Sequence, residues 1–248
     1  MKFSIIYIAI GLLLFSCETP KSESKEPVND SFKFEVKYFG ALKNMMHKGD
    51  VSAKANLSDI ENSEHLYAIG ALENLKGEIQ IIDGESFNTF VLDSAIRFDK
   101  SFDRKAALLV YAIVEAWNTY EIPDDIKTYE QLEDHIASVA KQNGINVNEP
   151  FPFLIDGTAK SFDWHVINWK DGDTEHSHEK HVNSGLNGTI ENEEVKLLGF
   201  YSDSHHAIFT HHTTNMHIHV KTIDNEIAGH VDGLTLGKGM LLKLPAAN

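Results

Sequence analysis

The chain has 248 residues, of which 42% are apolar, enough for the core of one large domain or two small ones. Its 37 acidic and 22 basic residues give a net charge of −15, which argues against nucleic acid or anionic lipid as a partner, because both bind basic surfaces.

The first seventeen residues have the pattern of an export signal. Lys2 precedes an apolar run that ends at Phe15, and this run is shorter than a typical transmembrane helix. The run continues into LLFSC, which resembles a bacterial lipobox with Cys17 as the lipidated residue; plain secretion and an uncleaved anchor are the alternatives. Cys17 is the only cysteine, which fits export. We therefore expect a signal peptide over 1–17, a flexible tether over 18–31, one domain over 32–248, and membrane contact through the N-terminal lipid only.

Helices dominate the expected structure of the first half. Helical spacing of apolar residues predicts a helix over 38–48 that Gly49 can end. Ser58 and Glu61 have capping-box spacing, which indicates a capped turn or short helix. Strands follow over 65–72, 77–83 and 86–92, with a hairpin turn at the Asp-Gly pair 83–84. Two helices then follow over 104–120 and 128–144, the second opened by a capping box of Thr128 and Gln131.

The second half favours strands. Short strands are expected over 151–157, 160–169, 185–191, 195–201, 206–212, 216–222, 226–232 and 240–245. Their close spacing suggests an antiparallel barrel or sandwich. The fold class is therefore α+β, with helices early and β-structure late.

Fourteen histidines are many, and eleven of them follow residue 160. His217 and His219 alternate along one strand, so both side chains point the same way. His230 lies in the next strand, which an antiparallel turn can bring alongside. Three neutral imidazoles match a catalytic zinc site, which keeps a fourth position open. A solvated pair of histidines on an outward face is the alternative.

Several segments together resemble one enzyme family. MHIHVKTIDNEIAGHVD, at 216–232, is similar to the HLHF…GGHVLD segment of alpha-acetolactate decarboxylase, with the same interval between the histidines. Residues 65–87 resemble that family's GTFDALDGELIVLDGKAY, and residues 39–50 resemble its early ALLAGLYDG helix. Residues 150–167 and 188–202 follow in the family's order. The resemblance spans about residues 36–235.

This resemblance implies decarboxylation of 2-acetolactate, a 2-hydroxy-3-keto acid, to acetoin. It implies zinc, or another divalent metal, held by His217, His219 and His230. It also implies a mixed sheet with helices in the N-terminal half, packed on a C-terminal β-barrel that carries the metal, and a possible homodimer. The family's glutamate in DGEL matches Glu78 in KGEI, which implies proton transfer or substrate orientation; a solvated turn glutamate is the alternative.

The chain departs from the family at two positions. The family's arginine, which contacts the substrate carboxylate, corresponds most nearly to His165, with Lys160 close but less well aligned. A protonated histidine binds carboxylate but lacks the two-pronged fork of arginine. The family's tail glutamate has no counterpart in LLKLPAAN, and the nearest glutamate upstream is Glu226. The alternative function is a non-catalytic extracytoplasmic protein on the same fold that binds metal or a small ligand.

Two further stretches are rich in histidine. SDSHHAIFTHHTTN contains His205, His206, His211 and His212, and strand alternation places His211 and His212 on opposite sides. One of each pair could enter the pocket and take part in acid–base chemistry near neutral pH, and a solvated surface position is the alternative. EHSHEKH, at 175–181, is expected to be a solvated polar loop, or at most an adventitious metal binder.

Overall fold

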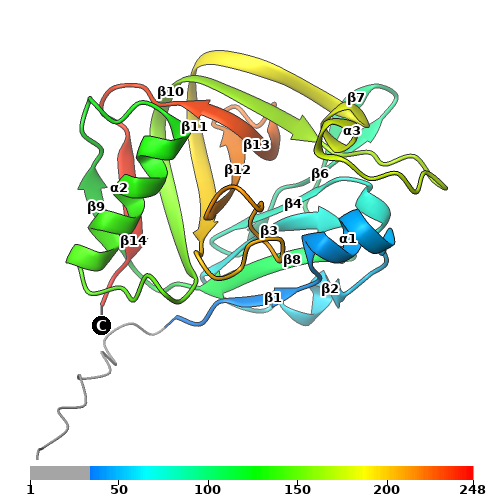
Figure 1. Ribbon diagram of the computed structural model, residues 1–248, viewed down its shortest axis with the longest axis horizontal. Helices are drawn as coiled ribbons and strands as arrows, with labels where there is room; N and C mark the ends of the chain where they lie inside the picture. Colours follow the sequence, from blue (N-terminus) through cyan, green and yellow to red (C-terminus); the bar gives the residue numbers. More distant parts are fainter. Residues whose placement is uncertain (1–33, 248) are drawn as a thin grey trace, which may run out of the picture.

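The structure is a computed structural model that describes residues 34–247. The expected signal peptide, Cys17 and the expected tether lie outside the described residues. Two β-sheets make up most of the described chain, and three α-helices lie at their edges (Figure 1). No helix in residues 34–247 is both long and apolar enough to cross a membrane.

The first sheet is built entirely from residues that precede 114. Its main path runs β1-β8-β3-β4-β6-β7, with β2 paired to β8 and β5 paired to β4. The strands are β1 (Lys37–Phe39), β2 (Ala55–Asn56), β3 (Leu66–Leu72), β4 (Glu78–Ile82), β5 (Glu85–Ser86), β6 (Asn88–Leu92), β7 (Ala95–Asp99) and β8 (Lys105–Ile113). The predicted turn between β4 and β5 is confirmed: Asp83 and Gly84 both have positive φ, 52° and 78°.

The second sheet follows the order β11-β12-β13-β10-β14-β9. Its strands are β9 (Trp117–Glu121), β10 (Phe151–Val166), β11 (Leu186–Tyr201), β12 (Met216–Thr222), β13 (Ala228–Thr235) and β14 (Leu241–Pro245). Because β10 also pairs with β11, the four strands β10 to β13 pair in a closed circuit. β14 and β9 extend from that circuit to an edge.

The helices are α1 (Leu42–Lys48), α2 (Tyr129–Gln142) and α3 (His178–Asn183), with short 3-10 turns η1 (Leu57–Asp59) and η2 (Glu73–Leu75). α1 ends as predicted at Gly49, which is left-handed with φ 63°. α2 begins as predicted with a capping box, in which the Thr128 hydroxyl accepts from the Gln131 backbone and the Gln131 side chain accepts from the Thr128 backbone.

The predicted helix over 104–120 is wrong. These residues form β8 and β9, which belong to different sheets. β8 is buried on both faces: Leu108 and Val110 pack into one hydrophobic cluster, and Leu109 packs into another. A strand buried on both faces is apolar throughout and loses its alternation, so its pattern matches that of a buried helix.

Other expectations also need correction. The first half is mostly β-structure rather than helical, and all pairings between the named strands are antiparallel, so neither sheet is mixed. Residues 206–212 form a loop with one isolated bridge, not a strand. The strands expected at 151–157 and 160–169 are one strand, β10, and those at 185–191 and 195–201 are one strand, β11.

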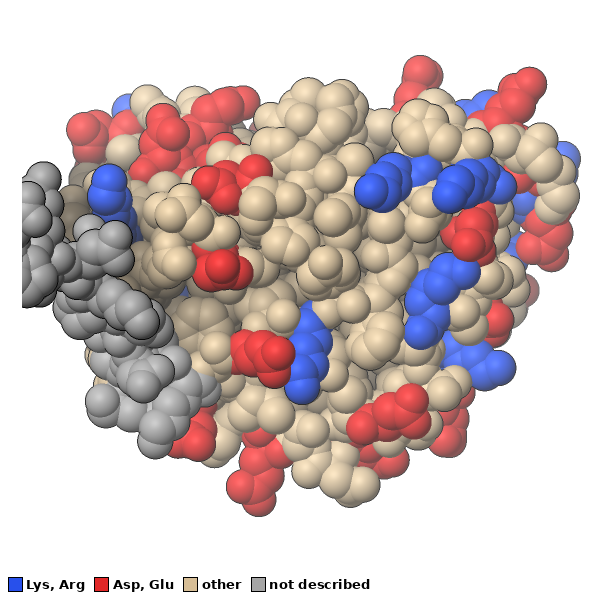
Figure 2. Space-filling view, turned by 60° about the horizontal axis from the view of Figure 1, so that its bottom comes forward, with Lys and Arg blue, Asp and Glu red and all other residues tan. Residues whose placement is uncertain are grey.

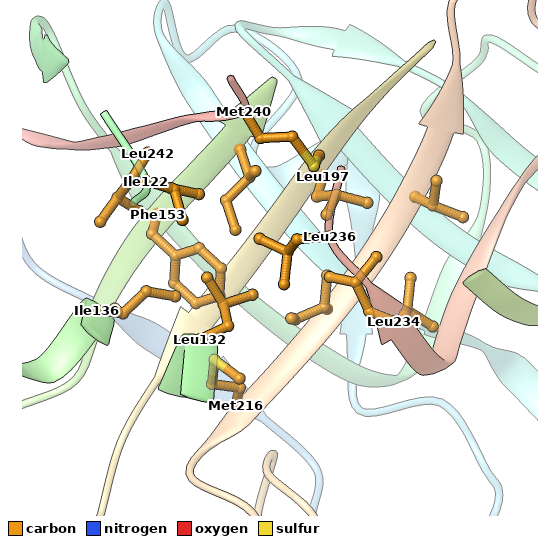
Figure 3. Close-up of a cluster of buried hydrophobic side chains, with 14 of the residues drawn as sticks. Ile122, Leu132, Ile136, Phe153, Leu197, Met216, Leu234, Leu236, Met240 and Leu242 are labelled. Carbon is orange, nitrogen blue, oxygen red and sulfur yellow. The ribbon is translucent and has the colours of Figure 1, made fainter. Parts of the chain in front are cut away.

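Three hydrophobic clusters hold together the two sheets, α1 and α2. Figure 3 shows part of the largest, where Leu132 and Ile136 of α2 lie against Phe153, Leu197 and Met216 of the second sheet. A second cluster joins the sheets, since it contains residues such as Ile69 of β3 together with residues such as Leu198 of β11.

The two sheets are also tied by hydrogen bonds. The Thr89 hydroxyl on β6 donates to the carbonyl of Ala228 on β13 over 2.9 Å. On the outer face shown in Figure 2, charged side chains of both signs are scattered among uncharged ones, as expected for a solvated surface.

Candidate metal centre

The three predicted metal ligands come together. His217 and His219 share one face of β12, and His219 pairs directly with His230 on β13. Ligand nitrogens of all three lie within 4.8 Å of one another. The Nε2 atoms of His217 and His219 are 3.2 Å apart. Two nitrogens bound to one tetrahedral zinc at about 2.0–2.1 Å would stand roughly 3.3 Å apart, so the residues fit a metal of this kind.

Burial keeps these imidazoles neutral. Burial, with the charge of His165, lowers the pKa of His217 to about 4. Burial and the neighbouring imidazoles hold the pKa values of His219 and His230 well below the ordinary histidine value. A neutral imidazole is the form that binds a metal, so the environment prepares the ligands before any cation arrives.

Glu78 reaches this cluster from the other sheet. It is the first residue of β4, and its side chain is buried. One carboxylate oxygen, Oε1, accepts from the backbone N–H of Ile167 over 3.1 Å. The other, Oε2, lies 3.8 Å from Nε2 of His219. Burial raises the pKa of Glu78 to about 7, against the opposing effects of His165 and of the hydrogen bond from Ile167. A solvated turn position for Glu78 is therefore wrong.

His165 lies between two carboxylates. It pairs with His230 across β10 and β13, and its Nδ1 donates to Oδ2 of Asp232 over 2.7 Å. Its Nε2 is 3.8 Å from Oε1 of Glu78. Burial lowers the pKa of His165, but the hydrogen bond to Asp232 and the charge of Glu78 outweigh it, so the pKa is raised.

Asp232 is a site residue that sequence reasoning missed. Besides His165, its other oxygen faces Nε2 of His178 at 3.7 Å and Nε2 of His230 at 3.9 Å. The register between β10 and β13 shifts here, so Asp232 is the extra residue of a bulge, a device that re-aims side chains. The alternation that groups His217 with His219 could have found it, because Asp232 stands two residues after His230.

These residues open into a cleft of about 1090 Å³ between the sheets and α1. Glu78, His165, His217 and His230 line its inner end. A second set of histidines also lines the cleft, which are His47, His176, His178, His181, His211 and His212.

The second set of histidines changes two expectations. The stretch 175–181 is not simply a solvated loop: His176 stacks on Trp169, with ring centroids 4.4 Å apart, and its Nδ1 lies 2.9 Å from Nε2 of His181. His211 and His212 both line the cleft, because a loop frees them from strand alternation.

The remaining candidates lie elsewhere. His205 packs against Tyr38 and Phe209, and His206 hydrogen-bonds the Asn215 side chain over 2.6 Å; neither is among the residues that line the cleft. Lys160 and Glu226 are exposed, outside the cleft lining.

Comparisons with known proteins identify the family and the fold. The family model described as alpha-acetolactate decarboxylase matches residues 38–244. The fold is similar to that of alpha-acetolactate decarboxylase from Bacillus subtilis strain 168, with a TM-score of 0.69, 18% sequence identity and 86% of each chain covered. It is also similar to a Staphylococcus aureus protein of unknown function described as similar to alpha-acetolactate decarboxylase, with a TM-score of 0.64, 15% identity and 85% of each chain covered. No curated protein sequence matches.

Proposed function

The chain belongs to the alpha-acetolactate decarboxylase family, and from that premise we propose that it catalyses metal-dependent decarboxylation of a 2-hydroxy-3-keto acid such as 2-acetolactate, with acetoin as the product. The observation that carries the proposal is the meeting of His217, His219 and the partly exposed His230 with Glu78 and His165 in one cleft. These side chains come from four strands of two sheets.

His217, His219 and His230 are the residues that would hold the metal. Zinc is the first choice, because three imidazoles with one open position form a common catalytic zinc site. When bound, the cation supplies Lewis-acid stabilisation of the negative charge that develops on the substrate oxygens.

The proposed reaction breaks one carbon–carbon bond. The bond between the carboxylate carbon and C2 breaks, CO2 leaves, and the electron pair moves toward the neighbouring carbonyl to give an enediolate. One proton then adds to C2. The hydroxy-keto acid anion and one proton thus become a hydroxyketone and carbon dioxide, with no change that requires an external oxidant or reductant.

Glu78 is the proposed proton carrier for this step. Its Oε1 is held by the Ile167 backbone, which fixes the carboxyl group beside the metal ligands. Its Oε2 faces His219 and the cleft. A carboxyl group fixed in this way can deliver a proton to one face of the enediolate, which sets the handedness of the product.

His165 is proposed to bind the substrate carboxylate in place of the family's arginine. Its Nδ1 is engaged by Asp232, so Nε2 is the nitrogen left toward Glu78 and the cleft. One imidazole gives one donor, so the carboxylate would be held less rigidly than by arginine. Asp232 acts on the substrate only through His165 and is therefore a positioning residue.

The test uses the chain from residue 18 onward, loaded with zinc and supplied with racemic 2-acetolactate. Acetoin formation and bound zinc are measured for the parent protein and for His219→Ala, Glu78→Gln and His65→Asn. His65→Asn is the control, because His65 lies on an exposed turn with positive φ, which asparagine tolerates.

We expect His219→Ala to lose both zinc and acetoin, Glu78→Gln to keep zinc but lose acetoin, and His65→Asn to keep both. Zinc binding without acetoin in the parent protein would overturn the decarboxylase proposal. That result would leave a metal-binding or ligand-binding protein on the same fold.

We also propose that the protein acts outside the cytoplasm, attached to the cell envelope by a lipid on Cys17. This rests on the pattern of residues 1–17. The substrate would then have to be present outside the cytoplasm to reach the protein.

A further inference from the structure

The cleft extends well beyond the inner site. Pockets of roughly 300–1,000 Å³ hold drug-sized ligands, and this cleft measures about 1090 Å³. 2-Acetolactate has only two methyl groups as apolar parts, so most of the cleft would stay empty of it. The question is which chemistry the remaining space suits.

One wall of the extension is an apolar row that starts beside Glu78. Ala71 on β3 pairs with Glu78 on β4, and Ala71 pairs with Leu108 on β8 on its other side. Directly paired residues point to the same face of a sheet, so Leu108, Ala71 and Glu78 form one line across three strands. All three line the cleft. Ala71 contributes only a methyl group, which keeps the passage beside the Glu78 carboxyl open.

The row ends against α1. Leu42, Met45 and Met46 of this helix line the far end of the cleft, and Leu75 of η2 lies in the same lining. Methionine packs well against irregular apolar groups because its side chain is flexible and polarizable. The same helix also contributes Lys43 and His47 to the lining, so polar side chains border the apolar row where it meets α1.

The first turn of α1 is hydrogen-bonded to the loop that follows β11. The backbone N–H of Leu42 donates to the carbonyl of Ile208, and that of Lys43 donates to the carbonyl of Ala207, each over 2.8 Å. Met45 is buried against β3 and β8 within the cluster that joins the two sheets.

We propose that the preferred substrate is a 2-hydroxy-3-keto acid carrying an apolar group larger than methyl, on C2 or on the keto carbon. That group lies over Ala71, between Leu108 and α1, while the hydroxy-keto acid end stays at the histidines and Glu78. The inference rests on the proposed decarboxylation and adds the substrate class to it.

The first test compares decarboxylation of 2-acetolactate with that of analogues whose alkyl group is lengthened stepwise at either position. Burial of one CH2 contributes about 0.8 kcal/mol, which corresponds to about a fourfold rise in kcat/KM per methylene placed on the apolar wall. We expect kcat/KM to rise over the first few methylenes in one of the two series. A steady fall from 2-acetolactate onward in both series would overturn the inference and leave the decarboxylase proposal standing.

Two variants locate the effect. Ala71→Leu fills the passage and should lower the ratio of kcat/KM for the long analogue to that for 2-acetolactate by about tenfold or more, as expected when several buried methylenes lose their place. Met46→Ala enlarges the far end and should move the optimum to a longer chain. Lys160→Ala, at an exposed position outside the cleft lining, is the control. An unchanged chain-length profile in both Ala71→Leu and Met46→Ala would contradict the assignment.

A binding measurement separates this inference from the proposed function. 2-Hydroxy-2-alkyl carboxylic acids lack the keto group and cannot be decarboxylated by this route. Calorimetric titration of the zinc-loaded protein with this series should show an affinity that rises with alkyl length. In Ala71→Leu, the affinity should no longer rise with alkyl length. The same rise without any turnover of keto acids would keep the apolar subsite and overturn the decarboxylase. Affinity independent of length would overturn the subsite.

Discussion

Replacing Asp232 by asparagine tests how His165 is oriented. The two residues share a hydrogen bond of 2.7 Å in which the imidazole Nδ1 donates to a carboxylate oxygen, and both side chains are largely buried. Asparagine keeps the shape of aspartate but removes its charge. Its amide can also turn an NH2 group toward Nδ1, which would force the imidazole proton onto Nε2 or rotate the ring away. The first change removes the positive charge of the imidazolium, and the second turns Nε2 away from Glu78 and the cleft.

The size of the effect follows from this hydrogen bond. A hydrogen bond to a charged group contributes about 1.5–3 kcal/mol. If the substrate is bound in the transition state by a correctly oriented His165, loss of that amount lowers kcat/KM by roughly 10-fold to 150-fold. The amount of bound zinc should stay the same, because Asp232 is not one of the three ligands. Its Oδ1 lies 3.9 Å from Nε2 of His230, beyond hydrogen-bond distance.

The assay measures kcat/KM for the best decarboxylated acid and zinc content on the same preparation. Asp163→Asn is the matched control, because Asp163 lies on the same strand as His165 with an exposed side chain that bonds Thr189. Unchanged kcat/KM in Asp232→Asn would refute a positioning role. Loss of zinc together with activity would also refute it, since Asp232 would then support the metal ligands instead.

Three further predictions concern stability and location. Burial, followed by the charge of His176, lowers the pKa of His181 to about 4, below the value of about 6.5 in an unfolded chain. The neutral His181 ring therefore contributes its full share of the free energy of unfolding above about pH 6.5, and this contribution is lost as the pH falls toward 4. His181→Phe should therefore lose less Tm than the parent protein between about pH 7 and pH 5, and equal losses would contradict this. Thr128→Ala removes the cap of α2 and should lower stability by about 1 kcal/mol, or roughly 2–4 °C in Tm, whereas an unchanged Tm would mean that the cap contributes little. Cys17→Ala should abolish incorporation of labelled fatty acid and release the protein from the membrane fraction of its native host, and labelling that persists would exclude this lipid site.

The metal ligands were predictable because strand alternation is a strong local rule. His217 and His219 fixed one face of a strand, and the short turn before His230 limited where the third ligand could lie. Glu78 could not be placed in this way. It lies on a strand of the other sheet, and only the resemblance to a family linked it to the histidines.

Errors in the predicted fold arose where burial removed the pattern. β8 is apolar on both faces and was indistinguishable from a buried helix. β10 was predicted as two strands because Gly157 and its neighbours are typical of a break, yet the strand continues through Gly157, where an added Cβ would lie 3.1 Å from Met240. The position of His178 beside Asp232 depends on where α3 lies relative to the second sheet, which no local periodicity encodes.

The hydrogen bond from Ile167 to Glu78 has a consequence for how this protein can change in evolution. The three histidines that would bind the ion all belong to the second sheet, whereas Glu78, the proposed proton carrier, belongs to the first. Substitutions can therefore change metal binding and the proposed proton delivery independently of each other. Substitutions in the first sheet can remove or alter the proposed reaction while the second sheet still binds the metal. Descendants of this fold that keep three histidines without the glutamate would be ion carriers or sensors inherited from a catalyst.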